Sequence, residues 1–240
     1  MRAITKPPMA PKGRARKPSA VITHDTQRAP RRRLSPALRE HEIVAQAVLF
    51  FAEFGFDGKT RALAERLGIT QPLLYRYFPS KEALIERVYQ DVFVGGWNPF
   101  WEELIRDREK TIKTRLTVFY QEYSKIIMTC EWVRLFMFSG LKGLDYNARY
   151  LRFLRETIFI QIIAELRATY GRPGLAELPA TALEIEAIWG LHAGIFYLGV
   201  RKWIYMMPIA DDIRPVIEMK VANFLDGVGA ILAAPARGAA

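Results

Sequence analysis

The segment from Gln71 to Tyr77, QPLLYRY, concentrates side chains able to recognise another molecule. The amide of Gln71 carries a donor and an acceptor that match the edge of adenine, and the apolar atoms of Leu73 suit the methyl group of thymine. The phenols of Tyr75 and Tyr77 and the guanidinium of Arg76 reach phosphate oxygens. These residue types together indicate an element that contacts a DNA groove.

The residues before this segment have the spacing of a helix-turn-helix. We expect Thr60 to cap a short helix, Gly68 to supply the turn that ends it, and Thr70 to cap a second helix. Ala64, Gly68 and Leu74 fit a small residue at a helix crossing, a glycine in the turn and an apolar residue in the angle. Any two short helices that meet at a glycine would also satisfy this spacing.

The outer face of the second helix favours the helix-turn-helix. If Leu74 and Phe78, four residues apart, face the core, the residues around them are left at the rim or outside. These residues are Gln71, Pro72, Leu73, Tyr75, Arg76 and Tyr77. A hydrophobic core does not require these side chains at the rim or on the outer face. Ser80 is then expected to cap a longer linking helix, and Lys81 in its first turn is placed to contact the DNA backbone.

Some of these side chains have a structural alternative. Tyr75 and Tyr77 could pack their rings and expose only the hydroxyl group, as buried amphipathic aromatics often do. Arg61 and Arg76 could be ordinary solvated charges. For Gln71 we expect a contact with a base.

The stretch from Gly58 to Val88, GKTRALAERLGITQPLLYRYFPSKEALIERV, resembles the DNA-binding domain of the TetR family of bacterial transcriptional regulators, most specifically in LYRYFPSKEAL. The resemblance covers residues 38–90 and implies a three-helix DNA-binding domain, a linking helix, an all-helical C-terminal domain and a homodimer. Positions that face bases or nearby backbone in the family correspond to Arg61, Gln71, Pro72, Leu73, Tyr75 and Tyr77. Positions that touch phosphates correspond to Thr60, Thr70, Arg76 and Lys81. Leu73 stands where tetracycline-repressor-like sequences carry a small polar residue, so a detailed operator preference is not carried over.

The N-terminal residues differ from the rest of the chain in charge and composition. Residues 1–35 hold ten of the 35 Lys and Arg residues and one acidic residue, so the remainder of the chain is nearly neutral. Several prolines and few apolar residues predict a disordered basic tail over residues 1–34. Such a tail is either an arm attracted to phosphates or a solubilising extension.

Beyond residue 94 the apolar spacing predicts helices only. GGWNP at residues 95–99 ends the linking helix, and further helices are expected near 99–109, 111–129, 131–143, 145–171, 180–206 and 211–234. We therefore predict an all-α protein. Its predicted parts are the tail 1–34, a helix-turn-helix DNA-binding domain with its linking helix over 35–94, and a helical ligand-binding and dimerisation domain over 95–234.

The segment AIWGLHAGIFYLGVRKW, residues 187–203, is apolar nearly all round. Glycines stand where a neighbouring backbone could approach, at Gly190, Gly194 and Gly199. A helix of this composition is expected to be buried, and flanking charges such as Glu184 and Arg201 argue against a bilayer span. With the last helix it could build a four-helix interface about a two-fold axis, or it could be the core helix of one subunit.

An excess of aromatic residues in this half could line an apolar cavity for a ligand, or could simply form the core. The candidates are Trp101, Tyr123, Trp132, Phe136, Tyr150, Trp189, His192 and Phe196, with Phe119 and Phe153 as further aromatics. His192, Arg134 or Asn147 could orient a ligand, although His192 could equally be a hydrogen-bonded core histidine.

The chain has few residues for metal binding or nucleophilic catalysis. Cys130 is the single cysteine, which excludes an intrachain disulfide and fits a reducing compartment. Cys130 and the three histidines, His24, His41 and His192, show no spacing typical of a zinc site or a catalytic triad. We expect no cofactor and no enzymatic activity. The N-terminus has no apolar signal segment, so a cytoplasmic location without membrane contact is expected, although its Arg-rich start also occurs in transit peptides.

The sequence thus predicts a homodimeric repressor that a small apolar or amphipathic effector releases from a palindromic operator in double-stranded DNA. One alternative is an architectural protein that binds DNA without sequence preference through the basic tail. Another is an enzyme or a carrier of apolar ligands with an incidental DNA domain.

Overall fold

The computed structural model describes residues 35–233, and the predicted basic tail lies outside them. Its first element is α1 (Pro36–Phe54), and the Ser35 hydroxyl caps this helix by accepting from the backbone N–H of Leu38. The buried face of α1 includes Ile43, Ala47 and Phe51, at the helical spacing read from the sequence.

The next three helices have the boundaries that local capping chemistry predicts. They are α2 (Thr60–Leu67), α3 (Gln71–Tyr77) and α4 (Lys81–Tyr89). Gly68 ends α2 in the left-handed conformation with φ 64° and ψ 34°, which side chains with a Cβ rarely adopt. The hydroxyl of Thr70 accepts from Leu73 N–H and that of Ser80 from Ala83 N–H, so both predicted caps are confirmed.

The prediction that Thr60 caps α2 is wrong. Lys59 occupies the N-cap position and makes no side-chain cap, whereas Thr60 is the first helical residue and is buried. The Thr60 hydroxyl faces α3, where it has two hydrogen-bond partners, and is therefore not turned toward its own helix end.

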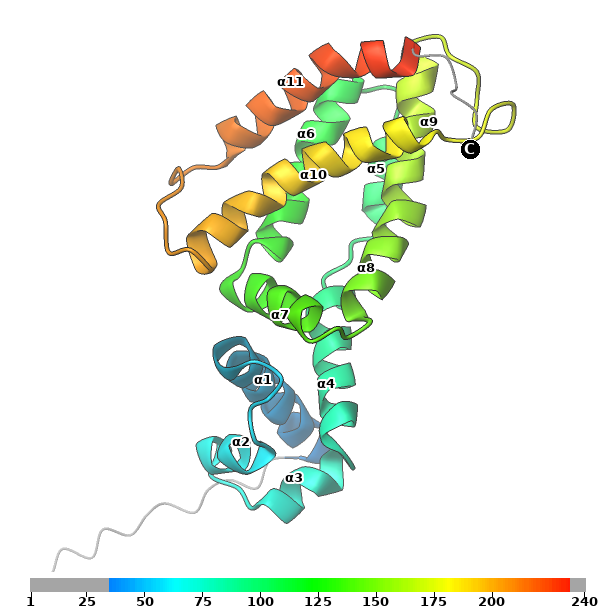
Figure 1. Ribbon diagram of the computed structural model, residues 1–240. Helices are drawn as coiled ribbons and strands as arrows, with labels where there is room; N and C mark the ends of the chain where they lie inside the picture. Colours follow the sequence, from blue (N-terminus) through cyan, green and yellow to red (C-terminus); the bar gives the residue numbers. More distant parts are fainter. Residues whose placement is uncertain (1–34, 234–240) are drawn as a thin grey trace, which may run out of the picture. The chain divides into compact units, whose positions relative to one another are not determined.

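The C-terminal part is also helical, and the described residues 35–233 contain no strand (Figure 1), which confirms the all-α class. Its elements are η1 (Gln90–Val94), α5 (Phe100–Arg106), α6 (Ile112–Ile127), α7 (Cys130–Leu141), α8 (Tyr146–Leu154), η2 (Arg155–Phe159), α9 (Ile160–Thr169), α10 (Ala182–Trp203) and α11 (Arg214–Ala233).

Two π-helical turns, η1 and η2, interrupt helices that the sequence reads as continuous. The linking helix passes from α4 into η1, and the predicted helix over 145–171 is divided into α8, η2 and α9. Each turn carries one inward-facing phenylalanine, Phe93 in η1 and Phe159 in η2. A π turn rotates the following side chains relative to an uninterrupted α-helix, so it changes which residues face the core.

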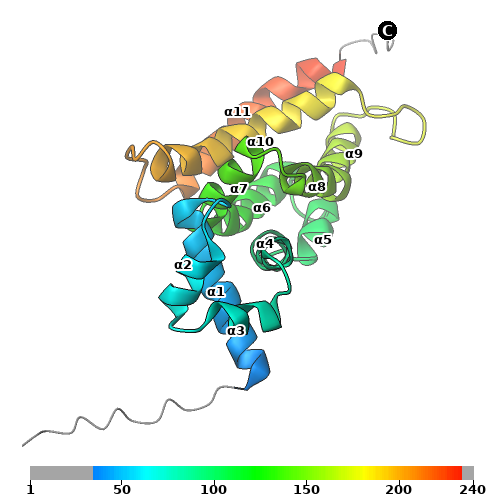
Figure 2. The same cartoon turned by 60° about the horizontal axis from the view of Figure 1, so that its bottom comes forward.

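Helices α10 and α11 lie side by side in both views (Figures 1 and 2), and α10 also packs on α6, α7 and α9. By length and composition α10 could cross a membrane, and its packing against these helices accounts for its many apolar residues. Within one chain this helix is not buried on every side, because Leu183 is 56% and Tyr197 is 51% exposed, and its burial in an interface between subunits stays a prediction. Gly199 packs within its own subunit against Val133, whereas the side of α10 at Gly190 is open.

Candidate nucleic-acid interface and aromatic core

A buried hydroxyl joins α2 to α3. Thr60 Oγ1 lies 2.9 Å from the Tyr75 hydroxyl and accepts from Gln71 Nε2 at 3.1 Å. Gln71 and Tyr75 are four residues apart, so they lie on the same face of α3 and both reach the start of α2. Gln71 and Tyr75 therefore have a structural use beside the expected contact with DNA, since they also connect the two helices.

The outer face of α3 presents the remaining candidates. Pro72, Tyr75 and Arg76 are exposed, and Leu73 is half-buried. Tyr75 keeps 37% of its surface exposed although its hydroxyl is bonded, so its ring edge stays accessible. Tyr77 is half-buried and packs against the core, in agreement with the structural alternative for this residue.

The candidates for phosphate contact lie around α3 in different surroundings. Arg61 forms an ion pair with Glu65 at 3.2 Å, with both side chains more than two-thirds exposed, so the guanidinium exchanges readily with solvent. Thr70 is exposed at the start of α3. An exposed guanidinium whose carboxylate partner is also exposed can exchange that partner for a phosphate oxygen.

Lys81 has a different environment from Arg61. It lines a pocket of about 220 Å³ together with Asp57 and Lys142, between the start of α4 and the end of α7. The hydrogen bond from Lys142, with a smaller effect of the Lys81 charge, holds the pKa of Asp57 below its usual range. Lys81 therefore lies near an acidic group, and its contact with DNA stays a prediction.

With this geometry in place, comparison with known proteins identifies the domain. Residues 43–88, which contain α2 and α3, match the family described as bacterial regulatory proteins, tetR family. Residues 43–88 thus form a TetR-family domain.

Solved structures share the fold over most of the chain. A TetR-like transcriptional regulator from Rhodococcus sp. matches with a TM-score of 0.59 at 18% identity, over 81% of this chain and 100% of that one. A protein assigned as a transcriptional regulator from Pseudomonas aeruginosa matches with a TM-score of 0.59 at 16% identity, over 82% and 93% of the two chains. A TetR-family protein from Mesorhizobium loti matches with a TM-score of 0.51 at 16% identity, over 83% and 98%. At these identities the likeness establishes the fold alone.

Two arginines connect the C-terminal helices to the helices of the TetR-family domain. Arg134 of α7 donates to the backbone carbonyls of Ala52 and Glu53 at the end of α1. Arg149 of α8 makes two hydrogen bonds, at 3.0 and 3.1 Å, to the carboxylate of Glu86 in α4. The hydrogen bond from Arg149 also holds the pKa of Glu86 below its usual range.

These contacts correct the sequence expectation for Arg134, which binds α1 and is not available to orient a ligand. The side-chain nitrogen of Asn147 likewise donates to the Phe136 carbonyl at 3.0 Å, whereas its side-chain oxygen is buried without a partner. Sequence reading missed both roles because each partner is distant along the chain or belongs to the backbone.

The eight aromatic and histidine candidates of the C-terminal half lie together in one cluster. Trp101 packs edge-on against Tyr123, and the Tyr123 hydroxyl lies 2.6 Å from that of Tyr150. Tyr150 contacts Trp132, which stacks on Phe136 and meets Phe196 edge-on. His192 lies between Tyr123 and Trp189. Together with Phe93, Phe119, Tyr120 and Phe159 we call this cluster the aromatic core.

The structure adds Tyr120, Phe93 and Phe159 to the residues that sequence reading singled out. The position of Tyr120, next to Phe119 and three residues before Tyr123 on α6, is a helical signal that would have found it. Phe93 and Phe159 depend on the π turns and carry no such signal. Phe153 stays 40% exposed and packs edge-on against Trp97, which contacts Trp101 of the core.

Several polar atoms of the aromatic core have no hydrogen-bond partner. They are Nε1 of Trp101 and of Trp132, the hydroxyl of Tyr120 and Nδ1 of His192. Burial lowers the pKa of His192 to about 4, and it raises the pKa of the Tyr120 and Tyr123 hydroxyls well above their usual value. At neutral pH the aromatic core is therefore uncharged.

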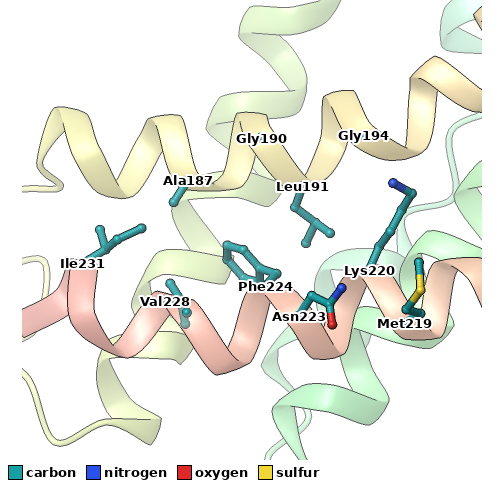
Figure 3. A pocket seen from close by; sticks show the side chains of 11 residues that line it. Ala187, Gly190, Leu191, Gly194, Met219, Lys220, Asn223, Phe224, Val228 and Ile231 are labelled. Carbon is teal, nitrogen blue, oxygen red and sulfur yellow. The ribbon is translucent and has the colours of Figure 1, made fainter.

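A shallow groove runs between α10 and α11 (Figure 3). It has a volume of about 460 Å³ and is lined mainly by apolar groups, among them Leu191, Phe224 and Ile231. Figure 3 shows Leu191 and Phe224 between the two helices. A Cβ built on Gly190 would meet no atom within 4 Å, and one on Gly194 would meet only Lys220 Nζ at 3.4 Å. This side of α10 is thus open along the groove.

Proposed function

We propose that the chain is a homodimeric transcriptional repressor that binds a palindromic site in double-stranded DNA through α3 and is released by a small apolar or amphipathic effector. The observation that carries the proposal is the exposed polar face of α3, held at a defined angle to α2 by the Thr60 hydroxyl, within a TetR-family domain. In this proposal residues 35–94 bind DNA and residues 95–234 bind the effector and the second subunit. The protein acts in the cytoplasm, without a membrane partner, and is not an enzyme.

The open side of α10 and α11 supports dimerisation. Two long apolar helices leave Leu183, Tyr197 and Met219 exposed beside the groove, and a second copy would cover them. Glycine at position 190 leaves space for a helix of the partner to approach closely. A two-fold arrangement of four such helices buries both apolar faces and sets the two α3 helices one helical turn of DNA, about 34 Å, or a multiple of it apart.

Neighbouring residues on α7 and α8 support a connection between effector and DNA. On α7, Trp132 and Phe136 belong to the aromatic core, while Arg134 between them holds the end of α1. On α8, Tyr150 belongs to the core and the adjacent Arg149 holds α4. A ligand that shifts either helix would therefore move the contacts that position the DNA-binding helices.

The size of the effect depends on the difference between two affinities. An effector that binds the core better when the two α3 helices are wrongly spaced weakens DNA binding by the coupling free energy, about 1–3 kcal/mol. A ligand with equal affinity for both states would leave the DNA affinity unchanged.

Selection from a library of random DNA duplexes at a fixed salt concentration tests the proposal. The wild type should recover a palindrome, and Gln71→Ala should lose roughly 10- to 100-fold in affinity and its preference at one base pair of each half-site. Gln121→Ala removes the same amide from α6, outside the proposed DNA-binding residues, and serves as the matched control. Sedimentation of the complex should give two chains per site, and a monomer bound at micromolar concentration would contradict the dimer.

A second candidate function rests on the charge of residues 1–35, which hold ten Lys and Arg residues against one acidic residue. In that case the protein binds DNA without sequence preference through its basic tail. Deleting residues 2–33 would then abolish binding, whereas a specific repressor would lose affinity and salt dependence but keep its preferred site. Sequence-independent binding that Gln71→Ala leaves unchanged would favour this second function.

A further inference from the structure

The aromatic core gathers unpartnered polar atoms. Among residues 35–233, eight side chains hold a buried nitrogen or oxygen without a hydrogen-bond partner, and four of them, Trp101, Tyr120, Trp132 and His192, belong to this one cluster. A buried polar group without a partner costs about 1–3 kcal/mol, so proteins rarely keep several together without a use for them. Their concentration in one cluster points to a site where a ligand supplies the missing hydrogen-bond partner.

The unpartnered atoms are mainly donors. The indole nitrogens of Trp101 and Trp132 can only donate, and the Tyr120 hydroxyl can donate or accept. The Tyr123 and Tyr150 hydroxyls are bonded to each other at 2.6 Å, and this bond uses one of their two hydrogens. The pair therefore has one further hydrogen to offer. A complementary ligand must supply acceptor atoms.

The core also limits the charge of its ligand. Its side chains are aromatic rings and one histidine, which is neutral at pH 7. Arg134 of α7 and Arg149 of α8 are bound to α1 and α4. A carboxylate or an ammonium group in this core would be buried without a counter-charge, which costs several kcal/mol.

The edge of the core is formed by rings that are only partly buried. Phe136 and Phe196 contact each other at 5.4 Å between ring centroids, and both lie against the buried Trp132. Two π turns, which are rare and often occur at functional sites, supply Phe93 and Phe159 to the same core. A planar ligand can displace one of these edge rings, Phe136 or Phe196, and stack on the aromatic faces that the ring had covered.

We propose that the aromatic core binds an uncharged aromatic molecule that carries acceptor oxygens, such as an aryl ketone, with Tyr120, Trp101 and Trp132 as its hydrogen-bond donors. This inference rests on the proposed effector-responsive function, for which it names the chemical class of the effector. It also assigns to Tyr120, which sequence reading did not select, a role in determining ligand specificity.

Equilibrium dialysis of the full-length protein against matched compounds of three sizes tests the proposal. Each set contains a ketone, its hydrocarbon analogue and its carboxylate: acetophenone, ethylbenzene and benzoate; 2-acetylnaphthalene, 2-ethylnaphthalene and 2-naphthoate; xanthone, xanthene and a xanthone carboxylate. In at least one size the ketone should bind at least tenfold more tightly than both analogues, because it alone satisfies the donors without bringing a charge. The proposal is overturned if no ketone binds, or if at every size an analogue binds as tightly as the ketone.

Conservative variants test the named donors. Tyr120→Phe should weaken binding of the preferred ketone roughly fivefold and leave the affinity for its hydrocarbon analogue unchanged. Without ligand, the same change should leave the free energy of unfolding unchanged or raise it, since the hydroxyl has no partner to lose. Tyr170→Phe is the matched control, because its hydroxyl donates to the Leu225 carbonyl at 2.9 Å, outside the core. Equal loss of hydrocarbon and ketone binding in Tyr120→Phe would show a packing effect and overturn the assigned role.

Measurements of operator binding keep this inference separate from the proposed function. If the protein binds a selected palindrome but shows no preference for a ketone over its analogues, the ligand chemistry is wrong and the repressor stands. If the ketone preference is present but the protein selects no palindrome, the repressor is wrong and the ligand chemistry stands.

Discussion

We expect the hydroxyl group of Thr60 to contribute both to folding stability and to DNA binding. Thr60→Val replaces this hydroxyl by a methyl group of similar volume in a side chain that is 7% exposed, so it removes two hydrogen bonds without opening a cavity. A net contribution of about 1 kcal/mol for each bond sets an upper value of about 2 kcal/mol. Gln71 and Tyr75 are both accessible to water and regain part of this energy, so the expected loss is about 1 kcal/mol.

A double-mutant cycle with Tyr75→Phe isolates the bond between the two hydroxyl groups. Urea unfolding followed by circular dichroism should give a loss of about 1 kcal/mol for each single variant. The double variant should lose less than the sum of the two, by about 1 kcal/mol, because both changes remove the same bond. The affinity of both single variants for a selected operator should fall, since α3 is less firmly held against α2.

Additive losses in this cycle, within about 0.3 kcal/mol, would refute the reasoning. They would mean that Thr60 and Tyr75 are bonded to water in solution and that the angle between α2 and α3 depends on packing alone. Thr70→Val is a useful control, because it removes a hydroxyl that only caps α3 and does not connect two helices. It should lower stability by a similar amount without any coupling to Tyr75→Phe.

Three further predictions concern the C-terminal half. Folding lowers the pKa of His192 from 6.5 to about 4, so between these pH values the unfolded chain binds more protons than the folded chain. The free energy of unfolding should therefore fall by about 3 kcal/mol as the pH drops from 7 to 4. His192→Gln should remove this part of the pH dependence of urea unfolding. Glu184→Ala should cost about 3–5 kcal/mol in chemical unfolding, because it leaves the guanidinium of Arg167 buried without its partner at 2.7 Å, and Glu184→Leu with Arg167→Met should recover most of the loss. Arg149→Met should cost less than about 1 kcal/mol, because the Glu86 side chain is 41% exposed and its ion pair is screened, yet amide hydrogen exchange in α4 should become faster. A flat pH profile in the wild type, a loss below 1 kcal/mol for Glu184→Ala, or unchanged exchange in α4 would contradict the respective prediction.

Local chemistry in the sequence was sufficient to predict the helix-turn-helix and most helix boundaries. Ser35, Thr70 and Ser80 cap the helices that follow them, and Gly68 ends α2, because each of these interactions joins residues within one turn of each other. The apolar spacing that places Leu74 in the core is equally local.

Tertiary structure alone decided the roles that depend on partners far apart in the chain. The hydroxyl of Thr60 faces α3 because Gln71 and Tyr75 offer it two bonds there, and no pattern within α2 reports those partners. Arg134 reaches a carbonyl 82 residues away and so serves α1 instead of a ligand. The aromatic core joins rings from α5, α6, α7, α8 and α10, and composition predicted those rings without their arrangement. Which polar atoms within it lack a partner depends on the packing of all these helices at once, which is why the donors that define the proposed ligand became visible only in the folded chain.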